Sequence, residues 1–204
     1  MQTSTQSLTE GVFLSSKILG SHLSPEDFAR FCHEQRDLHI ERNEAGEIEI
    51  MAPAYSLTGR INAEINRQLA NWNVTSQLGE VFDSSAGFFL DEEKQVMRSP
   101  DSAFIFKARF DALSEADRQG FFPLCPDFLI ELKSSTDSLP FLQQKMERYL
   151  GYGCQLGWLI DPTQEAVYIY HADGRRDVHK GFTQDLSAEP LLPGFSLVLS
   201  QLPK

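Results

Sequence analysis

The sequence predicts an α/β or α+β domain, in which helices flank a mixed β-sheet and a helix and a β-hairpin come first. The chain has 204 residues and 41% of them are hydrophobic, which is enough for one core. Strand-like runs stand on both sides of a strongly amphipathic segment at 138–153, an order that places helices on sheet faces. No linker divides the chain, so we expect a flexible segment over residues 1–20 and a single domain over residues 21–204.

The N-terminal third predicts two helices and a hairpin. The stretch SPEDFARFCHEQ (24–35) opens with Ser24 as an N-cap and Pro25 at the first helical position. The stretch LHIERNEAGEIEIMAP (38–53) alternates on both sides of a glycine-containing turn, which is typical of a β-hairpin. Apolar residues then recur at helical spacing, which predicts a helix from about residue 56 to residue 74.

The rest of the chain predicts a series of strands with two helices between them. A short helix is expected at 113–120, and the amphipathic segment at 138–153 predicts a longer one. The closing stretch at 191–202 predicts a strand or a turn. Strands are predicted at 80–90, 102–106, 127–133, 155–162 and 166–174, the fourth apolar enough to be central.

Charge, hydropathy and cysteine content exclude several classes of function. The net charge of −11 weighs against broad, nonspecific nucleic-acid binding, which depends on phosphate neutralisation, but it leaves a local basic groove open. No run approaches the roughly 20 apolar residues of a membrane span, and the first residues carry no secretion signal. The cysteines are odd in number and form no CxxC pair, so we expect reduced thiols in a cytoplasmic protein: Cys32, Cys125 and Cys154.

Two charges stand on an apolar predicted strand, Glu131 and Lys133. Residues two apart on a strand share a face, so these side chains project together, although the pair alone equally fits a structural ion pair. Asp101 begins the predicted strand at 102–106, and its carboxylate meets that of Glu131 if the two strands are neighbours about 5 Å apart. Asp127 lies roughly 13 Å from Glu131 along the strand, so we expect it to serve the turn or strand entry instead.

Two close carboxylates repel each other unless a cation lies between them. A divalent cation held by Asp101 and Glu131 would bind a phosphate oxygen and lower the pKa of a bound water. Lys133 would orient the attacking water and offset negative charge in the transition state. These three residues together predict a site that cleaves phosphodiester bonds.

The arrangement of SPD followed by ELK resembles the PD-(D/E)XK nuclease superfamily. Longer stretches from about residue 25 to residue 202 resemble the Uma-two family of restriction-endonuclease-like proteins, a former domain of unknown function. The resemblance implies a restriction-endonuclease-like core, Mg²⁺ as cofactor with Mn²⁺ as a substitute, and DNA as substrate. The stretches that carry it are DLHIERNEAGEIEIMAPA, FDSSAGFFL, RSPDSAFI, CPDFLIELKSSTDSL and QQKMERYLGYGCQLGWLIDP.

The resemblance also implies roles for single residues. Asp101 and Glu131 would be metal ligands and Lys133 would activate or orient the water. Glu64 matches a glutamate that the superfamily often supplies from the helix before the sheet, as a catalytic residue and third metal ligand. Lys145, next to Gln144, matches a residue supplied by the helix after the ExK strand. Glu64 and Lys145 also fit a second interpretation, as surface residues of charged helices.

The leading hypothesis is therefore a metal-dependent endodeoxyribonuclease, a hydrolase with no membrane partner. RNA is a less favoured substrate. The alternative is a non-catalytic assembly or binding protein that retains the nuclease fold. Because many nucleases of this superfamily pair to cut two strands, the resemblance makes a homodimer the oligomer to test for.

Overall fold

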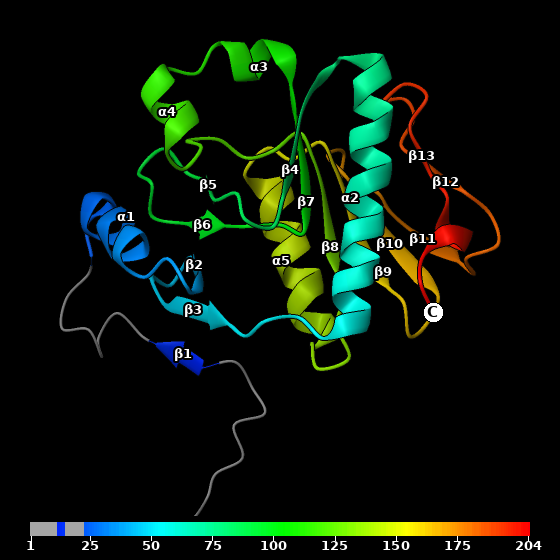
Figure 1. Cartoon of the computed structure of the whole chain (residues 1–204), viewed down its shortest axis with the longest axis horizontal. Coiled ribbons are helices and arrows are strands. Elements are labelled where there is room, and N and C mark those ends of the chain that lie inside the picture. The colour runs from blue at the N-terminus through cyan, green and yellow to red at the C-terminus, as the bar shows by residue number, and fades with distance from the viewer. Residues whose placement is uncertain (1–11, 15–22) are drawn as a thin grey trace, which may run out of the picture.

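The computed structural model describes residues 12–14 and 23–204 of the chain. Its centre is a six-stranded sheet in the order β11-β10-β9-β8-β7-β4 (Figure 1). Strands β8 and β9 run parallel and every other neighbouring pair is antiparallel, so the predicted mixed sheet is confirmed. The strands are β4 (Gly79–Asp83), β7 (Ser102–Phe106), β8 (Phe128–Leu132), β9 (Leu156–Asp161), β10 (Ala166–His171) and β11 (Arg176–Lys180).

A second, antiparallel sheet of five strands lies beside the first, in the order β1-β3-β2-β6-β5. It contains the predicted hairpin, with Ile40 opposite Ile50. The strand predicted at 80–90 is wrong as one element, because its halves belong to different sheets. The Asp83 carboxylate accepts the N–H of Ser85 at 2.9 Å in the turn that separates them. The strands of this sheet are β1 (Val12–Leu14), β2 (His39–Arg42), β3 (Ile48–Met51), β5 (Phe88–Phe89) and β6 (Met97–Arg98).

Two long helices cover opposite faces of the six-stranded sheet (Figure 1). Helix α2 (Ser56–Ser76) packs on the face that carries Phe128 and Ile130, whereas α5 (Leu139–Gly151) packs on the face that carries Leu129. Successive residues of β8 alternate between the two faces, so Glu131 points toward α5. The inward side chains of the helices, at the predicted helical spacing, are Ile61, Ile65 and Leu69 of α2 and Leu142, Met146 and Tyr149 of α5.

The shorter helices begin where the capping residues predict. The hydroxyl of Ser24 accepts the N–H of Asp27 and starts α1 (Pro25–Glu34), and Ser114 starts α4 (Glu115–Gln119) in the same way. Helix α3 (Lys107–Asp111), directly after β7, was not predicted. The chain closes with the short pair β12 (Leu186–Ser187) and β13 (Ser196–Leu197) and the 3₁₀ helix η1 (Leu199–Gln201).

All three cysteines are free thiols. Burial raises the pKa of Cys125 to about 12 and that of Cys154 well above its usual value, and it raises the pKa of half-buried Cys32 to about 11. The Cys154 thiol donates to the carbonyl oxygen of Leu156 at 3.3 Å. Among the helices of the described residues, none is long and apolar enough to cross a membrane. Residues 1–11 and 15–20 of the predicted flexible segment lie outside the described residues.

Candidate active site

The two carboxylates of the predicted site meet at neighbouring strands. Strands β7 and β8 are antiparallel partners with Ser102 opposite Ile130, so the next position places Asp101 opposite Glu131. The Asp101 carboxylate accepts the N–H of Leu132 at 2.7 Å, which fixes it against β8. Burial and the charge of Glu131 raise the pKa of Asp101 to about 7. The charged form of Asp101 is therefore unfavourable beside Glu131.

Lys145 is the lysine that contacts Glu131. Its ammonium Nζ lies 2.9 Å from Oε1 of Glu131 and 3.1 Å from Oε1 of Glu41, and the residue is 7% exposed. Burial alone would lower the pKa of Lys145, but the two carboxylates raise it, so the side chain stays charged. Tyr149, one helical turn further along α5, donates its hydroxyl hydrogen to Glu131 at 2.8 Å. Helix α5 thus presents two hydrogen-bond donors to one carboxylate.

Lys133 follows the last residue of β8, and the contacts recorded for its ammonium are not with Glu131. Its ammonium lies 3.2 Å from the carbonyl oxygen of Ser134 and 3.9 Å from Oδ2 of Asp161. Asp161 ends β9, the parallel neighbour of β8, so Lys133 leans toward β9. Its role in orienting water stays a prediction.

Glu64 belongs to α2, the helix on the other face of the sheet. Its carboxylate accepts hydrogen bonds from Arg67 at 2.8 Å and Gln68 at 2.9 Å, and the bond from Arg67 lowers its pKa. Helix α2 reaches the site instead through Asn66, whose amide donates to the carbonyl oxygen of Asp101 at 3.0 Å. Metal ligation by Glu64 stays a prediction that requires its carboxylate to leave these partners.

Asp127 organises the entry to β8. Its carboxylate accepts the N–H of Phe106 at 2.9 Å, Arg109 at 2.9 Å and the side-chain amide of Gln155 at 2.7 Å. These bonds join β7, α3 and the start of β9, which agrees with the strand-entry role predicted for it.

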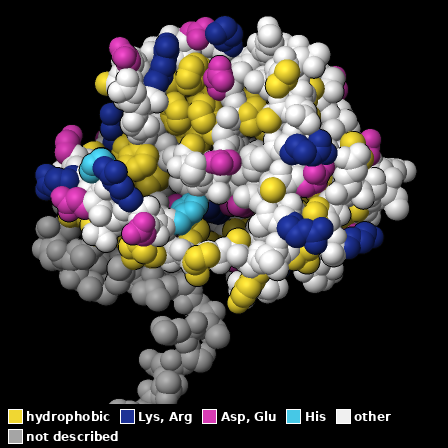
Figure 2. Space-filling model, viewed as in Figure 1, with side chains coloured by type: hydrophobic (Ala, Val, Ile, Leu, Met, Phe, Trp, Pro, Cys, Tyr) yellow, Lys and Arg dark blue, Asp and Glu magenta, His cyan; other side chains and the backbone are white. Residues whose placement is uncertain are grey.

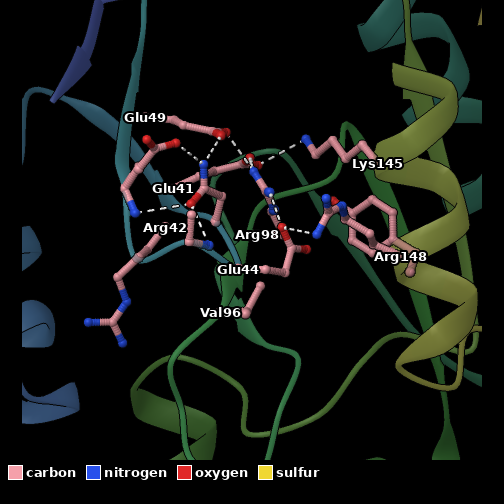
Figure 3. A network of polar contacts seen from close by, with 12 residues as sticks. Glu41, Arg42, Glu44, Glu49, Val96, Arg98, Lys145 and Arg148 are labelled. Carbon is pink, nitrogen blue, oxygen red and sulfur yellow. Dashed lines mark hydrogen bonds and ion pairs between the residues drawn. The ribbon is translucent and has the colours of Figure 1, made fainter. Parts of the chain in front are cut away.

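Lys145 also belongs to a buried network of charged residues that the sequence analysis did not predict (Figure 3). Glu41 and Glu49 lie opposite each other in the hairpin, and Arg98 binds both, at 2.9 Å and 2.6 Å. Burial alone would raise the pKa of Glu41, but Lys145, Arg98 and the N–H of Ser99 lower it to about 2. Like charges directly opposite in a hairpin destabilise it unless a cation is near. That cross-strand pair of glutamates is the signal that would have predicted a buried basic partner.

The residues present fit a divalent cation held by two carboxylates. Mg²⁺ prefers oxygen ligands and is commonly bound by one or two carboxylates, with water and substrate phosphate completing its shell. Asp101 and Glu131 supply such a pair, and burial together with the charge of Glu131 raises the pKa of Asp101, an effect that a nearby cation would oppose. Nowhere in residues 23–204 do three or more His, Cys, Asp or Glu side chains form a metal-binding cluster. The two-carboxylate arrangement is therefore the one that the site offers.

The mixed sheet and the helices on both of its faces define an α/β fold. The chain belongs to the Uma2 family, described as "putative restriction endonuclease", whose model matches residues 25–200. A solved structure described as a "putative nuclease belonging to DUF820" from Anabaena variabilis has a similar fold. It is 20% identical, with a TM-score of 0.67 over 80% of this chain and 88% of that chain. No curated protein matches the sequence. The predicted family and fold class are confirmed.

Proposed function

We propose that this protein is a Mg²⁺-dependent endonuclease that hydrolyses phosphodiester bonds in DNA. The observation that carries the proposal is the pairing of Asp101 with Glu131 across β7 and β8, with the Lys145 ammonium on Glu131. Membership of a family of restriction-endonuclease-like proteins supports hydrolysis of a nucleic acid. We further propose that Mn²⁺ can replace Mg²⁺, that the protein acts in the cytoplasm, and that it works as a homodimer.

Each residue of the site has a distinct task in this proposal. Asp101 and Glu131 would hold the cation, which would supply charge stabilisation and lower the pKa of a water. Lys133 holds the attacking water, since its ammonium stands at the end of the strand that carries Glu131. Lys145 offsets negative charge on the phosphate oxygens in the transition state. Glu64 is a third ligand only if it leaves Arg67, so Glu64→Gln would then weaken Mn²⁺ binding.

The distribution of charge limits how DNA would bind. The protein carries a net charge of −11, and on the face shown in Figure 2 Lys and Arg side chains are scattered among Asp and Glu. A surface like that face offers few phosphate contacts, so a cation would account for a large share of any attraction to DNA there. The same reasoning applies to RNA, so matched DNA and RNA duplexes are needed to separate the two substrates.

The decisive experiment is plasmid nicking with Mg²⁺ or Mn²⁺. Wild-type protein should nick supercoiled DNA, whereas Asp101→Asn and Lys133→Ala should lose at least about 100-fold in rate. Glu147→Gln is a matched control on α5, because Glu147 forms an exposed pair with Arg176 and should leave the rate unchanged. Nicking that is absent in pure wild-type protein, or equal in Lys133→Ala, would contradict the proposed catalysis.

A non-catalytic binding or assembly protein remains the second candidate. The burial of Lys145 between two carboxylates and the pairing of Lys133 with Asp161 favour it, because both lysines already have structural partners. This candidate predicts no stabilisation by Mn²⁺ in a thermal-shift titration. An increase in Tm with Mn²⁺ that disappears in Asp101→Asn would count against it.

A further inference from the structure

We propose that Glu41 is a positioning residue, which holds the Lys145 ammonium in the site when a divalent cation binds Glu131. This inference rests on the proposed function and adds to it the hairpin of the five-stranded sheet. Glu41 lies on β2, outside the sheet that carries Asp101 and Glu131. Its effect on cation binding is exerted through Lys145.

The Lys145 ammonium and a divalent cation compete for one carboxylate. Nζ of Lys145 lies 2.9 Å from Oε1 of Glu131, which is the ligand proposed for the cation. A cation bound to Glu131 would repel that ammonium. The ammonium then needs another carboxylate nearby, because a buried charge without a partner is costly. Glu41 supplies that partner, since its Oε1 already lies 3.1 Å from Nζ. The lysine can therefore give up Glu131 without leaving the site.

Glu41 is itself fixed in place. It is 1% exposed, Arg98 binds its Oε2 at 2.9 Å, and the N–H of Ser99 donates to its Oε1 at 2.8 Å. Ser99 stands two residues before Asp101, so one carboxylate holds both the lysine and the segment that leads to the first metal ligand. Lys145, Arg98 and the N–H of Ser99 lower the pKa of Glu41, so its carboxylate stays charged at neutral pH.

Glu41 is poorly placed to be a metal ligand. Arg98, Ser99 and Lys145 use both of its oxygens, and the described part of the chain contains no cluster of three potential metal-binding side chains. Direct ligation would require it to leave Arg98 or Ser99. An indirect effect through Lys145 requires no such change.

Glu49 offers a matched control. It carries the same charge in the same network, opposite Glu41 in the hairpin and 2.6 Å from Arg98. The structure records bonds of Glu49 to Arg98 and to Asn43, and in residues 23–204 it records none to Lys145 or Ser99. Glu49→Gln therefore removes an equal negative charge and leaves the Lys145 contact intact.

The test is a double-mutant cycle on Mn²⁺ affinity, measured by calorimetry in the absence of DNA. Glu41→Gln should weaken Mn²⁺ binding about tenfold, because Lys145 then has Glu131 as its only carboxylate partner. Lys145→Gln should tighten binding. In the Lys145→Gln background, Glu41→Gln should change the affinity no more than Glu49→Gln does in the wild-type chain. Glu41→Asp keeps the negative charge, but its shorter side chain moves the carboxylate away from Lys145, so this variant should also weaken Mn²⁺ binding. It replaces Glu41→Gln in the test if that variant does not fold.

Three results would overturn the role of Glu41. The first is equal weakening by Glu41→Gln with and without Lys145, which would indicate a direct ligand. The second is equal weakening by Glu41→Gln and Glu49→Gln, which would indicate a charge effect at a distance. The third is no weakening by either Glu41 variant. If the wild-type chain binds no Mn²⁺ at all, the proposed function itself fails, which is a different outcome from binding without coupling.

Discussion

Asp101 is a half-buried residue whose charged carboxylate is unfavourable in the folded chain without a cation. Its pKa is raised to about 7 by burial and by Glu131, compared with an ordinary value of 3.8. The folded protein binds this proton more tightly than the unfolded chain does, so the contribution to stability is complete below about pH 3.8 and is lost as pH rises toward 7. At neutral pH the site therefore costs free energy of folding.

Asp101→Asn should remove this cost. An asparagine oxygen can still accept the N–H of Leu132, so we expect the metal-free variant to be more stable than wild type at pH 8, by about 1–4 kcal/mol. At pH 4 the two proteins should be nearly equal. Urea unfolding in EDTA at the two pH values measures the difference. A variant that is destabilised equally at both would contradict the raised pKa.

At the residue scale, the sequence predicted the proximity of two residues of the candidate site. Asp101 and Glu131 could be placed together because strand alternation and the pairing of neighbouring strands determine where their side chains lie. The contact of Lys145 with Glu41 could not be predicted, because it depends on how the five-stranded sheet packs against α5, and no local sequence period indicates that packing. The pairing of Lys133 with Asp161 likewise needed the parallel order of β8 and β9.

At the scale of single elements, the edge strand β4 depends on a glycine. A methyl group added at Gly79 would lie 2.0 Å from the carbonyl oxygen of Ile105 and 2.6 Å from the ring of Phe104. The carbonyl oxygen of Ile105 belongs to the backbone of the neighbouring strand β7. It cannot move away from an added methyl group without distorting the sheet. We expect Gly79→Ala to destabilise the protein by about 3 kcal/mol or more, measured by urea unfolding.

Gly59 in α2 provides the control. An added methyl group there meets no atom within 4 Å, so Gly59→Ala should stabilise the helix by about 0.5–1 kcal/mol. If both alanine variants lost stability alike, the close approach at Gly79 would not be the cause.

Elements with local signals were predicted well, and elements set by tertiary packing were not. Helices α1 and α4 begin at serine caps that the sequence displays. Helix α3 has five residues, and Phe106 before it provides no side-chain cap, so it had no comparable signal. The division of residues 80–90 between two sheets also depends on contacts that the local alternation does not contain.

At the scale of the whole molecule, the buried network around Arg98 joins the five-stranded sheet to helix α5, through the contact of Glu41 with Lys145. Arg98 ends β6 of the five-stranded sheet, binds Glu41 and Glu49 of the same sheet, and stands three residues before Asp101. Breaking a buried ion pair leaves uncompensated charge, so Arg98→Met should lower the free energy of unfolding by about 3–5 kcal/mol. Urea unfolding checks this value.

Lys107→Met is the corresponding surface control. Lys107 and Asp111 form an exposed i,i+4 pair on α3, so its loss should change stability by no more than about 0.5 kcal/mol. Similar effects of the two substitutions would mean that the buried pairs of Arg98 contribute little to the stability of the fold.

The protected cysteines make the chain convenient for fluorescence labelling. A maleimide reacts with the thiolate, and the raised pKa values of Cys32, Cys125 and Cys154 leave little thiolate at pH 7. We expect the native protein to take up well under one equivalent of dye, and Val74→Cys, at a position 73% exposed on α2, to add one equivalent. Absorbance of the purified conjugate gives the count. A dye could thus be attached without first removing the natural sulfhydryls, and the labelled protein followed one molecule at a time.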